Sequence, residues 1–312
     1  MTSAIEAAEA PEAPLDVRPG FLRSKVLRQP QTVAGLTVLV LFVLIALLSP
    51  LLAPDPKAQV GAVFEAPSGA HPLGTDGGGA DMFKLLIAGA RVSLIVGFAA
   101  AVVSALIGGS IGLLSGFFGG KVDTILMRFT DYVIVIPDVP LMIVAAALFG
   151  RSLTNIILII GVIYWTTTAR LIRSQVKSVR ERVYVKRSRA LGAGNTRLIS
   201  KHVLPQVAPL LIANTVLLVA YAIFAETFIT FLGLGDPSLI SWGRLIENAF
   251  TDDALLNDAW WAIVPPGVCV ACVVLACMMV GQATEDSLNP RLSVGHLSVR
   301  RFGLRAVPRR EP

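Results

Sequence analysis

Apolar runs separated by polar segments dominate this 312-residue chain. Six runs of 18 to 24 residues carry at most one charged side chain each. A helix needs about 20 apolar residues to cross the hydrocarbon core of a bilayer. The pattern therefore predicts six membrane-spanning helices, with the 18-residue fourth run crossing steeply. They are expected at 34–53, 92–115, 132–150, 152–169, 203–225 and 261–280.

The composition agrees with a membrane protein and narrows the function classes. Hydrophobic residues make up 54% of the chain and charged residues 15%, against about 25% charged residues in soluble domains. Three cysteines, all between positions 269 and 277, cannot form the disulfide framework of a small secreted domain. The net charge of +6 would suggest a nucleic-acid partner only on a soluble face. We expect none, because the basic residues flank the spans.

The distribution of Lys and Arg predicts the orientation. With six crossings, 22 of the 27 basic residues fall on the side that holds both termini. Placing the ten at 170–202 in the bilayer centre would cost roughly 25 to 35 kcal/mol. We therefore expect both termini to be cytoplasmic. The predicted divisions are a disordered tail at 1–33, a span at 34–53, an outer loop at 54–91, a core at 92–283 containing a cytoplasmic loop (170–202) and an outer loop (233–259), and a basic tail at 284–312.

Small residues recur every fourth position in the second predicted span. This spacing puts them on one face of a helix, where a neighbouring helix could approach closely. We expect a packing role for this face. Its members are Ser104, Gly108, Gly112, Gly116 and Gly120.

The densest positive run lies in the predicted loop between the fourth and fifth spans. A helix is expected over VYVKRSRAL, and the glycines at 192 and 194 can end it. A second short helix, capped by Asn195 or Thr196, should precede interruptions at Pro205 and Pro209. On composition alone, a solvated loop attracted to anionic membrane lipids explains the charge. The spacing within the loop favours a second interpretation.

Gly192 is followed by nine residues and then by HVLP at 202–205. This spacing resembles the signature loop of binding-protein-dependent ABC importer permeases, in which a glycine and a later Leu-Pro pair recur. Further stretches resemble, in matching order, the second permease of the dipeptide and oligopeptide systems. They are LLSPLLAPDP (47–56), HPLGTD (71–76), GARVSLIVG (89–97), GFFGGKVDTILMR (116–128) and FLGLG with SWG (231–243).

The resemblance implies an all-α, six-span type I ABC importer permease in the bacterial inner membrane. It also implies partners: a similar second permease, two ATP-binding subunits that hold ATP and Mg, and an extracytoplasmic solute-binding protein. No cofactor is expected on this chain. The implied ATPase-coupling residues are Tyr184, Lys186, Arg187, Ser188, Arg189, Ala190, Leu191, Gly192, Leu204 and Pro205.

One departure from the family pattern concerns the start of this signature. Lys186, Arg187 and Ser188 stand where the family has Glu-Ala-Ala. Either the ATPase carries a compensating acid, or docking rests on shape and on apolar positions such as Leu191.

Two acids and one loop are further candidates for functional sites. Asp138 lies within the third predicted span and Glu226 near the outer end of the fifth, and ionisable groups at membrane depth mark functional paths. Either could attract a peptide's amino group in the translocation path, although pairing with Arg151 or helix packing would explain them equally well. The resemblance also implies binding-protein contacts at Gly74, Thr75, Asp76, Asp81 and Trp242.

Motifs for catalysis are missing from the sequence. GFFGGKV lacks the first Gly and the final Ser or Thr of a phosphate-binding loop, because Ser115 and Val122 stand there. Cys269 and Cys272 have metal-like spacing but lie in an apolar run without a nearby His or acid, so we expect no metal. We therefore expect a transporter subunit and not an enzyme. An ion-driven secondary transporter, or an importer of nickel chelates, glutathione or haem, remains an alternative.

Overall fold

The computed structural model describes residues 29–288, and these residues are helical apart from connecting loops. Most of each predicted tail, 1–33 and 284–312, lies outside this range. The described helices are α2 (Pro30–Leu52), α3 (Met82–Phe118), α4 (Gly120–Val135), α5 (Asp138–Phe149), α6 (Leu153–Arg180), α7 (Val183–Ala190), α8 (Asn195–Leu198), η1 (Ile199–Val203), α9 (Leu204–Ile229), η2 (Thr230–Leu234), α10 (Trp242–Thr251), η3 (Trp260–Ala262) and α11 (Val264–Leu288).

Within residues 29–288, five helices are long and apolar enough to cross a membrane, and the number is six if the bent pair of α4 and α5 is one span. The predicted all-helical membrane fold is thus confirmed. The side of the membrane on which the termini lie stays a prediction. The largest differences in length concern two helices: α3 begins at Met82, ten residues before position 92, and α6 continues to Arg180.

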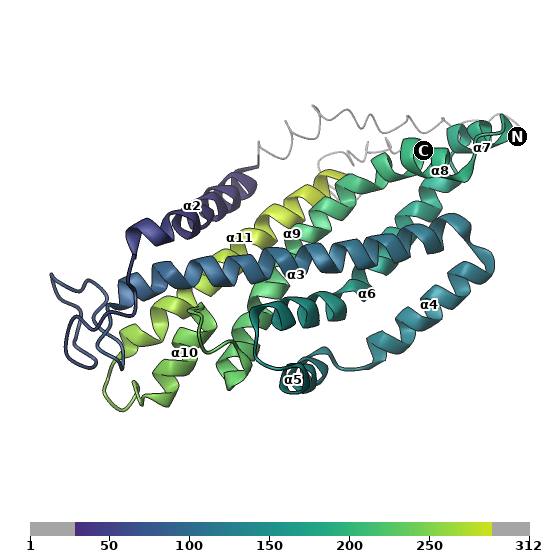
Figure 1. Ribbon diagram of the computed structural model, residues 1–312. Coiled ribbons are helices and arrows are strands. Elements are labelled where there is room, and N and C mark those ends of the chain that lie inside the picture. The colour runs from purple at the N-terminus through teal and green to yellow at the C-terminus, as the bar shows by residue number, and fades with distance from the viewer. Residues whose placement is uncertain (1–28, 289–312) are drawn as a thin grey trace, which may run out of the picture.

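The long helix α3 organises the bundle. It packs against α2, α6 and α9, while α11 packs against α9 and α2 (Figure 1). The small-residue face predicted for this helix lies against α6. A Cβ atom added at Gly108 or Gly112 would come within 2.4 or 2.6 Å of a carbonyl oxygen of α6. These glycines therefore permit backbone approach that any side chain would prevent. Gly120 is not part of the face, because α3 ends before it.

The third predicted span is a bent pair of helices and not one continuous helix. α4 ends at Val135, α5 begins at Asp138, and the two helices meet at 85°. Pro137 explains the break, since a residue before proline avoids the helical region, and Ile136 is extended with ψ 123°. The predicted boundary at Tyr132 falls inside α4.

The chain entering the fifth span also differs from the expectation. Pro205 lies in the first turn of α9, where no N–H is needed, and Pro209 lies inside the helix without ending it. A π-helical segment, η1, joins α8 to α9, so residues 195–234 form one long helical stretch. Gly194 occupies the N-cap of α8, and neither Asn195 nor Thr196 caps it.

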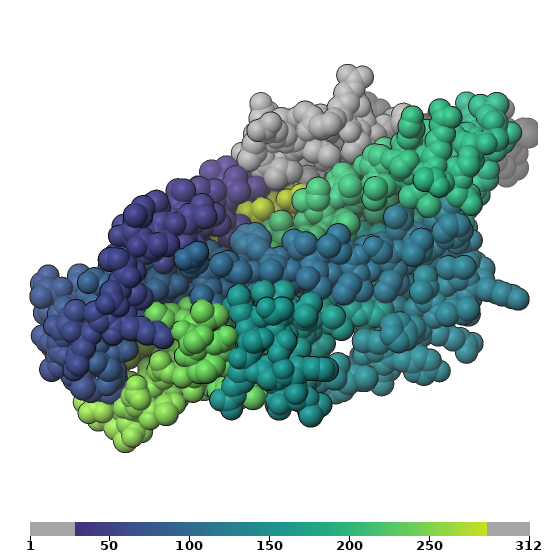
Figure 2. Space-filling model, viewed as in Figure 1, coloured from purple at the N-terminus to yellow at the C-terminus, as the bar shows by residue number. Residues whose placement is uncertain are grey.

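The bundle has two distinct ends. The α7 end holds α7 and α8, and the α10 end holds the 53–81 loop together with α10 (Figure 1). Figure 2 shows α2 along one edge of the molecule. Its outward side carries exposed Leu47 and Leu51, an arrangement typical of a helix that faces lipid.

Candidate functional site

The connection between α6 and α9 forms a bracket, defined here as residues 183–204. Its inner side is apolar. Val185 from α7 and Leu198 from α8 are buried in one cluster with Val176 and Val179 of α6. A helix of eight residues is too short to be stable alone. This packing therefore fixes α7 to the end of α6.

Polar and aromatic contacts fix the orientation of the bracket. The Ser188 hydroxyl lies 3.3 Å from Nε2 of His202, and the Tyr184 ring lies 6.0 Å from the same imidazole. The Arg189 guanidinium lies over the Phe117 ring of α3 at 5.6 Å. These contacts join α7 to η1 within the bracket and to α3 outside it, so the bracket is attached to both α6 and α3 of the bundle. Sequence patterns did not single out the Phe117 contact.

Gly192 makes the turn between the two short helices. Its φ is +85°, which glycine adopts without the steric cost that a Cβ imposes. The Gly192 N–H donates to the Arg189 carbonyl (3.0 Å), and the Ala193 N–H donates to the Ser188 carbonyl (3.1 Å). The turn is therefore specified by both backbone conformation and hydrogen bonding.

The outer side of the bracket carries most of the predicted coupling residues. Leu191 is 88% exposed, and Tyr184 and Leu204 are also exposed. Ala190, Gly192 and Pro205 share this exposure, as do the basic residues Lys186, Arg187 and Arg189, while Ser188 is half-buried. The structure thus presents a small apolar surface, surrounded by positive charge, at the α7 end.

Lys186 is engaged within the chain. Its Nζ lies 2.9 Å from the Glu181 carboxylate, and both side chains are exposed. The hydrogen bond from Lys186 lowers the pKa of Glu181 below its ordinary value. The cation at the family's acidic position therefore has a partner of its own.

An acid that the sequence analysis did not single out connects three helices beside the bracket. The Asp123 carboxylate of α4 accepts hydrogen bonds from Arg173 and Lys177 of α6 and from Ser115 of α3. The sequence held one signal of this cluster: GGKVDTILMR contains a single aspartate, and the later stretch that forms the end of α6 is rich in basic residues. The cluster fixes the start of α4, which otherwise has few buried residues.

At the α10 end, the residues of the HPLGTD stretch hold their own loop together. Thr75 has no exposed surface; its hydroxyl donates to the Ala62 carbonyl (2.6 Å). Trp261 donates through Nε1 to the Thr75 carbonyl (3.1 Å). Gly74 is buried with φ +63°, and the Asp76 carboxylate accepts the N–H groups at positions 78 and 80.

Asp81 and Trp242 also point inward. The Asp81 carboxylate caps α3 by accepting the Phe83 and Lys84 N–H groups, and it lies 3.0 Å from Nδ1 of His71. Trp242 has no exposed surface and donates through Nε1 to the Leu86 carbonyl (3.1 Å). These side chains are buried, so a binding protein could reach this region only through neighbouring exposed residues. The contact with a binding protein stays a prediction.

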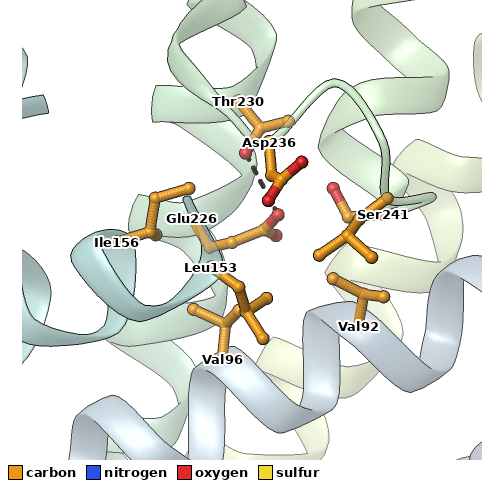
Figure 3. Close-up of a pocket in the computed structure, with 9 residues that line it drawn as sticks. Val92, Val96, Leu153, Ile156, Glu226, Thr230, Asp236 and Ser241 are labelled. Atoms are coloured by element: carbon orange, nitrogen blue, oxygen red, sulfur yellow. Dashed lines mark hydrogen bonds between the residues drawn. The ribbon is translucent and has the colours of Figure 1, made fainter. Parts of the chain in front are cut away.

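Glu226 lies in a small pocket between α3, α9 and the segment before α10 (Figure 3). Only 2% of its surface is exposed. Its carboxylate accepts hydrogen bonds from the hydroxyls of Ser93 (3.2 Å) and Thr230 (3.1 Å). Ser93 in turn accepts the Trp242 N–H (3.2 Å). These contacts tie α3, α9 and α10 together and enclose most of the carboxylate, so a role for Glu226 in a translocation path stays a prediction.

Asp138 has the opposite environment. It begins α5 and is exposed, and it does not pair with Arg151 among the described residues. Asp131, which lies earlier on α4, is paired with Arg170 at 2.6 Å. Of the two acids predicted for a translocation path, Asp138 is therefore the accessible one.

Comparisons with known proteins agree with this architecture. The family described as "Binding-protein-dependent transport system inner membrane component" matches residues 108–294. A Brucella suis protein named as a peptide transport system permease is 35% identical over 274 residues, which cover 86% of this chain and 91% of that protein. The dipeptide transport system permease protein DppC of Bacillus subtilis is 34% identical over 262 residues, 83% of this chain and 81% of that protein. The chain therefore belongs to the family of binding-protein-dependent transport system inner membrane components, and it is a multi-pass protein of the inner membrane.

Proposed function

We propose that this chain is one permease subunit of an ATP-driven importer that moves peptides across the inner membrane. The bracket carries the proposal: it is anchored on one side and exposes an apolar surface on the other. The names of the similar permeases, which specify peptide or dipeptide transport, support the substrate class. They give no support to a carrier driven by an ion gradient.

The bracket suits mechanical coupling to separate ATPase subunits. Its inner side is packed on α6 and is continuous with α9 through η1. A partner that binds Leu191 and Tyr184 and then moves would therefore tilt α6 and α9 together. ATP and Mg would be held by that partner, because the chain lacks a phosphate-binding loop.

The remaining partners follow from the same proposal. One set of spans provides one wall of an alternating-access path, so a similar second permease would supply the other. A solute-binding protein would meet the α10 end. There the buried motif residues shape the surface, and exposed side chains such as Leu256 and Trp260 would make the contact. Membrane lipids would cover the outward side of α2.

Two experiments test the function. The first reconstitutes the complete complex and measures substrate-stimulated ATP hydrolysis with dipeptides, oligopeptides, nickel chelates, glutathione and haem. We expect stimulation by peptides; stimulation by another class alone would replace the substrate assignment.

The second experiment tests the bracket directly. A photocrosslinker at Ala190, which is exposed, should capture an ATPase subunit in native membranes. Ser188 is a less suitable position because its hydroxyl lies against His202. The matched control is a crosslinker at Leu256, at the other end of the bundle, which should not capture the ATPase. Transport that continues without any capture from Ala190 would refute the coupling role.

A further inference from the structure

Asp138 is an exposed carboxylate without a cationic partner among residues 29–288. Its carboxylate accepts the N–H of Val139, the next residue in the chain, at 2.9 Å. No Lys, Arg or His of the described residues forms an ion pair with it. Asp131 shows the contrast, because its carboxylate lies 2.6 Å from the Arg170 guanidinium. Asp138 thus has unused capacity to bind a cation.

The helix register places this carboxylate near the junction of α5, α6 and α9, which pack together. Met142 of α5, Ile160 of α6 and Ala225 of α9 belong to one buried cluster. Residues four positions apart share a helix face. Asp138 precedes Met142 by four residues, Tyr164 follows Ile160 by four, and Tyr221 precedes Ala225 by four. All three side chains therefore lie one turn from the same cluster.

Contacts between these side chains agree with the register. The Tyr164 and Tyr221 ring centroids lie 6.3 Å apart, with the rings tilted by 48°. Tyr164 packs against the buried cluster that contains Met142, which follows Asp138 by one helical turn. Tyr221 is 52% exposed, so its ring is open to a ligand. An anionic group one helical turn from a cluster that two tyrosine rings also border is a combination that can bind ammonium groups, through a charge-assisted hydrogen bond and a cation–π contact.

The depth of the site argues against lipid as its surroundings. Tyr164 follows the start of α6 by eleven residues, which places it about 17 Å along a helix that crosses a hydrocarbon core about 30 Å thick. An ionised carboxylate facing lipid at that depth is costly, so intramembrane acids face a polar path or a partner. Asp138 is on the surface of the chain. That surface must therefore border a hydrated path or another subunit.

We propose that Asp138, Tyr164 and Tyr221 form a transient binding site for the free amino terminus of a translocated peptide. The proposal rests on the importer function given above and names the chemical group that this path recognises. The carboxylate accepts a hydrogen bond from the ammonium group. The two tyrosine rings contact the ammonium group through their apolar faces and through cation–π attraction. Glu226 cannot serve this role, because Ser93 and Thr230 enclose its carboxylate.

The test uses two peptides of the same sequence length, each with a free amino terminus, so that delivery to the permease is equivalent. One carries a diazirine side chain on its first residue and the other carries it on its last. Both are imported by the complete complex, irradiated during turnover and mapped by mass spectrometry. We expect the first peptide, and not the second, to label the segments around Asp138, Tyr164 and Tyr221.

Variants of the complete complex then test the charge. Asp138→Asn should reduce this labelling about tenfold, the loss expected for one charge-assisted hydrogen bond, and Asp138→Glu should retain most of it. Asp131→Asn removes the same charge from the preceding helix and should leave labelling unchanged. Equal labelling by the two peptides, or full labelling in Asp138→Asn, would overturn the amino-terminus site while import continued. Absence of import of either peptide by the unmodified complex would instead refute the peptide importer itself, and the site with it.

Discussion

The two ends of the bundle use their family-like motifs in opposite ways. At the α7 end, the motif forms a bracket whose anchored side is buried and whose opposite side exposes Leu191 and Tyr184. At the α10 end, Thr75 and Trp242 of the corresponding motifs are entirely buried. A motif in this chain can therefore mark either an exposed surface or the internal framework of a loop. Exposure, and not spacing, distinguishes the two.

The chemical composition of each motif explains the difference. The α7 motif is a short basic helix, and burying its charges without partners would be costly. The α10 motif consists of turn residues and hydrogen-bonding side chains, and a long loop needs these to satisfy its own backbone. The carboxylates of Asp76 and Asp81 accordingly accept four backbone N–H groups between them.

The largest expected effect tests the internal role of the α10 motif. Trp242→Ala removes an indole that contacts Phe42 edge-to-face and donates to the Leu86 carbonyl. Creating a cavity of this size should lower stability by about 3 to 5 kcal/mol. The loss would appear as a lower melting temperature of the purified complex in detergent. Trp260→Ala is the control, because Trp260 is 56% exposed and should cost little. Equal melting temperatures for the two variants would contradict the assignment.

The second effect concerns function at the α7 end with the fold retained. Leu191→Asp changes a side chain that is 88% exposed, so the melting temperature should stay close to that of the unmodified complex. Gly192→Pro cannot keep the native φ of +85°, since proline requires about −65°. In both variants we expect peptide uptake to fall at least tenfold, about 1.4 kcal/mol in coupling, with membrane insertion and basal ATP hydrolysis retained.

A matched variant sharpens this second prediction. Leu256 is 82% exposed and follows α10 in the chain, and α10 lies at the opposite end of the bundle from α7 (Figure 1). Leu256→Asp should leave the uptake-to-hydrolysis ratio unchanged, even if contact with a binding protein weakens. Normal uptake in both Leu191→Asp and Gly192→Pro would remove the basis for treating the bracket as a coupling element.

A smaller effect tests the α3 cap. Asp81→Ala removes the acceptor for the Phe83 and Lys84 N–H groups and the partner of His71. Loss of an N-cap costs about 1 kcal/mol, which should lower the melting temperature less than Trp242→Ala does. Asp81→Asn keeps a capping oxygen and should recover most of the loss. An Asp81→Ala complex with unchanged stability but impaired binding-protein affinity would reverse the interpretation and give Asp81 a contact role.

The sequence predicted the all-helical membrane fold and the approximate positions of five long apolar helices, because long apolar runs have few alternatives in a bilayer. It also predicted the glycine face of α3, where the four-residue spacing at Gly108 and Gly112 has a direct geometric meaning. It did not predict the 85° bend at Pro137. A long apolar run satisfies the same length criterion whether the helix continues through it or turns.

Side-chain orientation in the loops could not be derived from the sequence. Thr75 and Trp242 lie in polar segments, which suggested exposure, yet long-range hydrogen bonds to Trp261 and Leu86 bury them. Glu226 resembled Asp138 as an intramembrane acid until the hydroxyls of Ser93 and Thr230 were placed around it. These contacts join residues more than 130 positions apart or one helical turn apart, and only the fold shows which of them form.

The smallest expected effect decides whether charge contributes to docking at the bracket. Lys186→Gln removes the partner that lowers the pKa of Glu181. A carboxyl group whose pKa is lowered by folding stabilises the protein at pH values above its ordinary pKa. This contribution is lost as the pH falls through the folded-state pKa. The slight stability difference between Lys186→Gln and the unmodified complex should therefore be present at neutral pH and disappear in acid.

If docking depends on shape, uptake should change less than twofold in Lys186→Gln at constant ionic strength, because the apolar surface around Leu191 is intact. A tenfold loss that raised salt reproduces in the unmodified complex would instead show that the ATPase supplies an acid for this lysine.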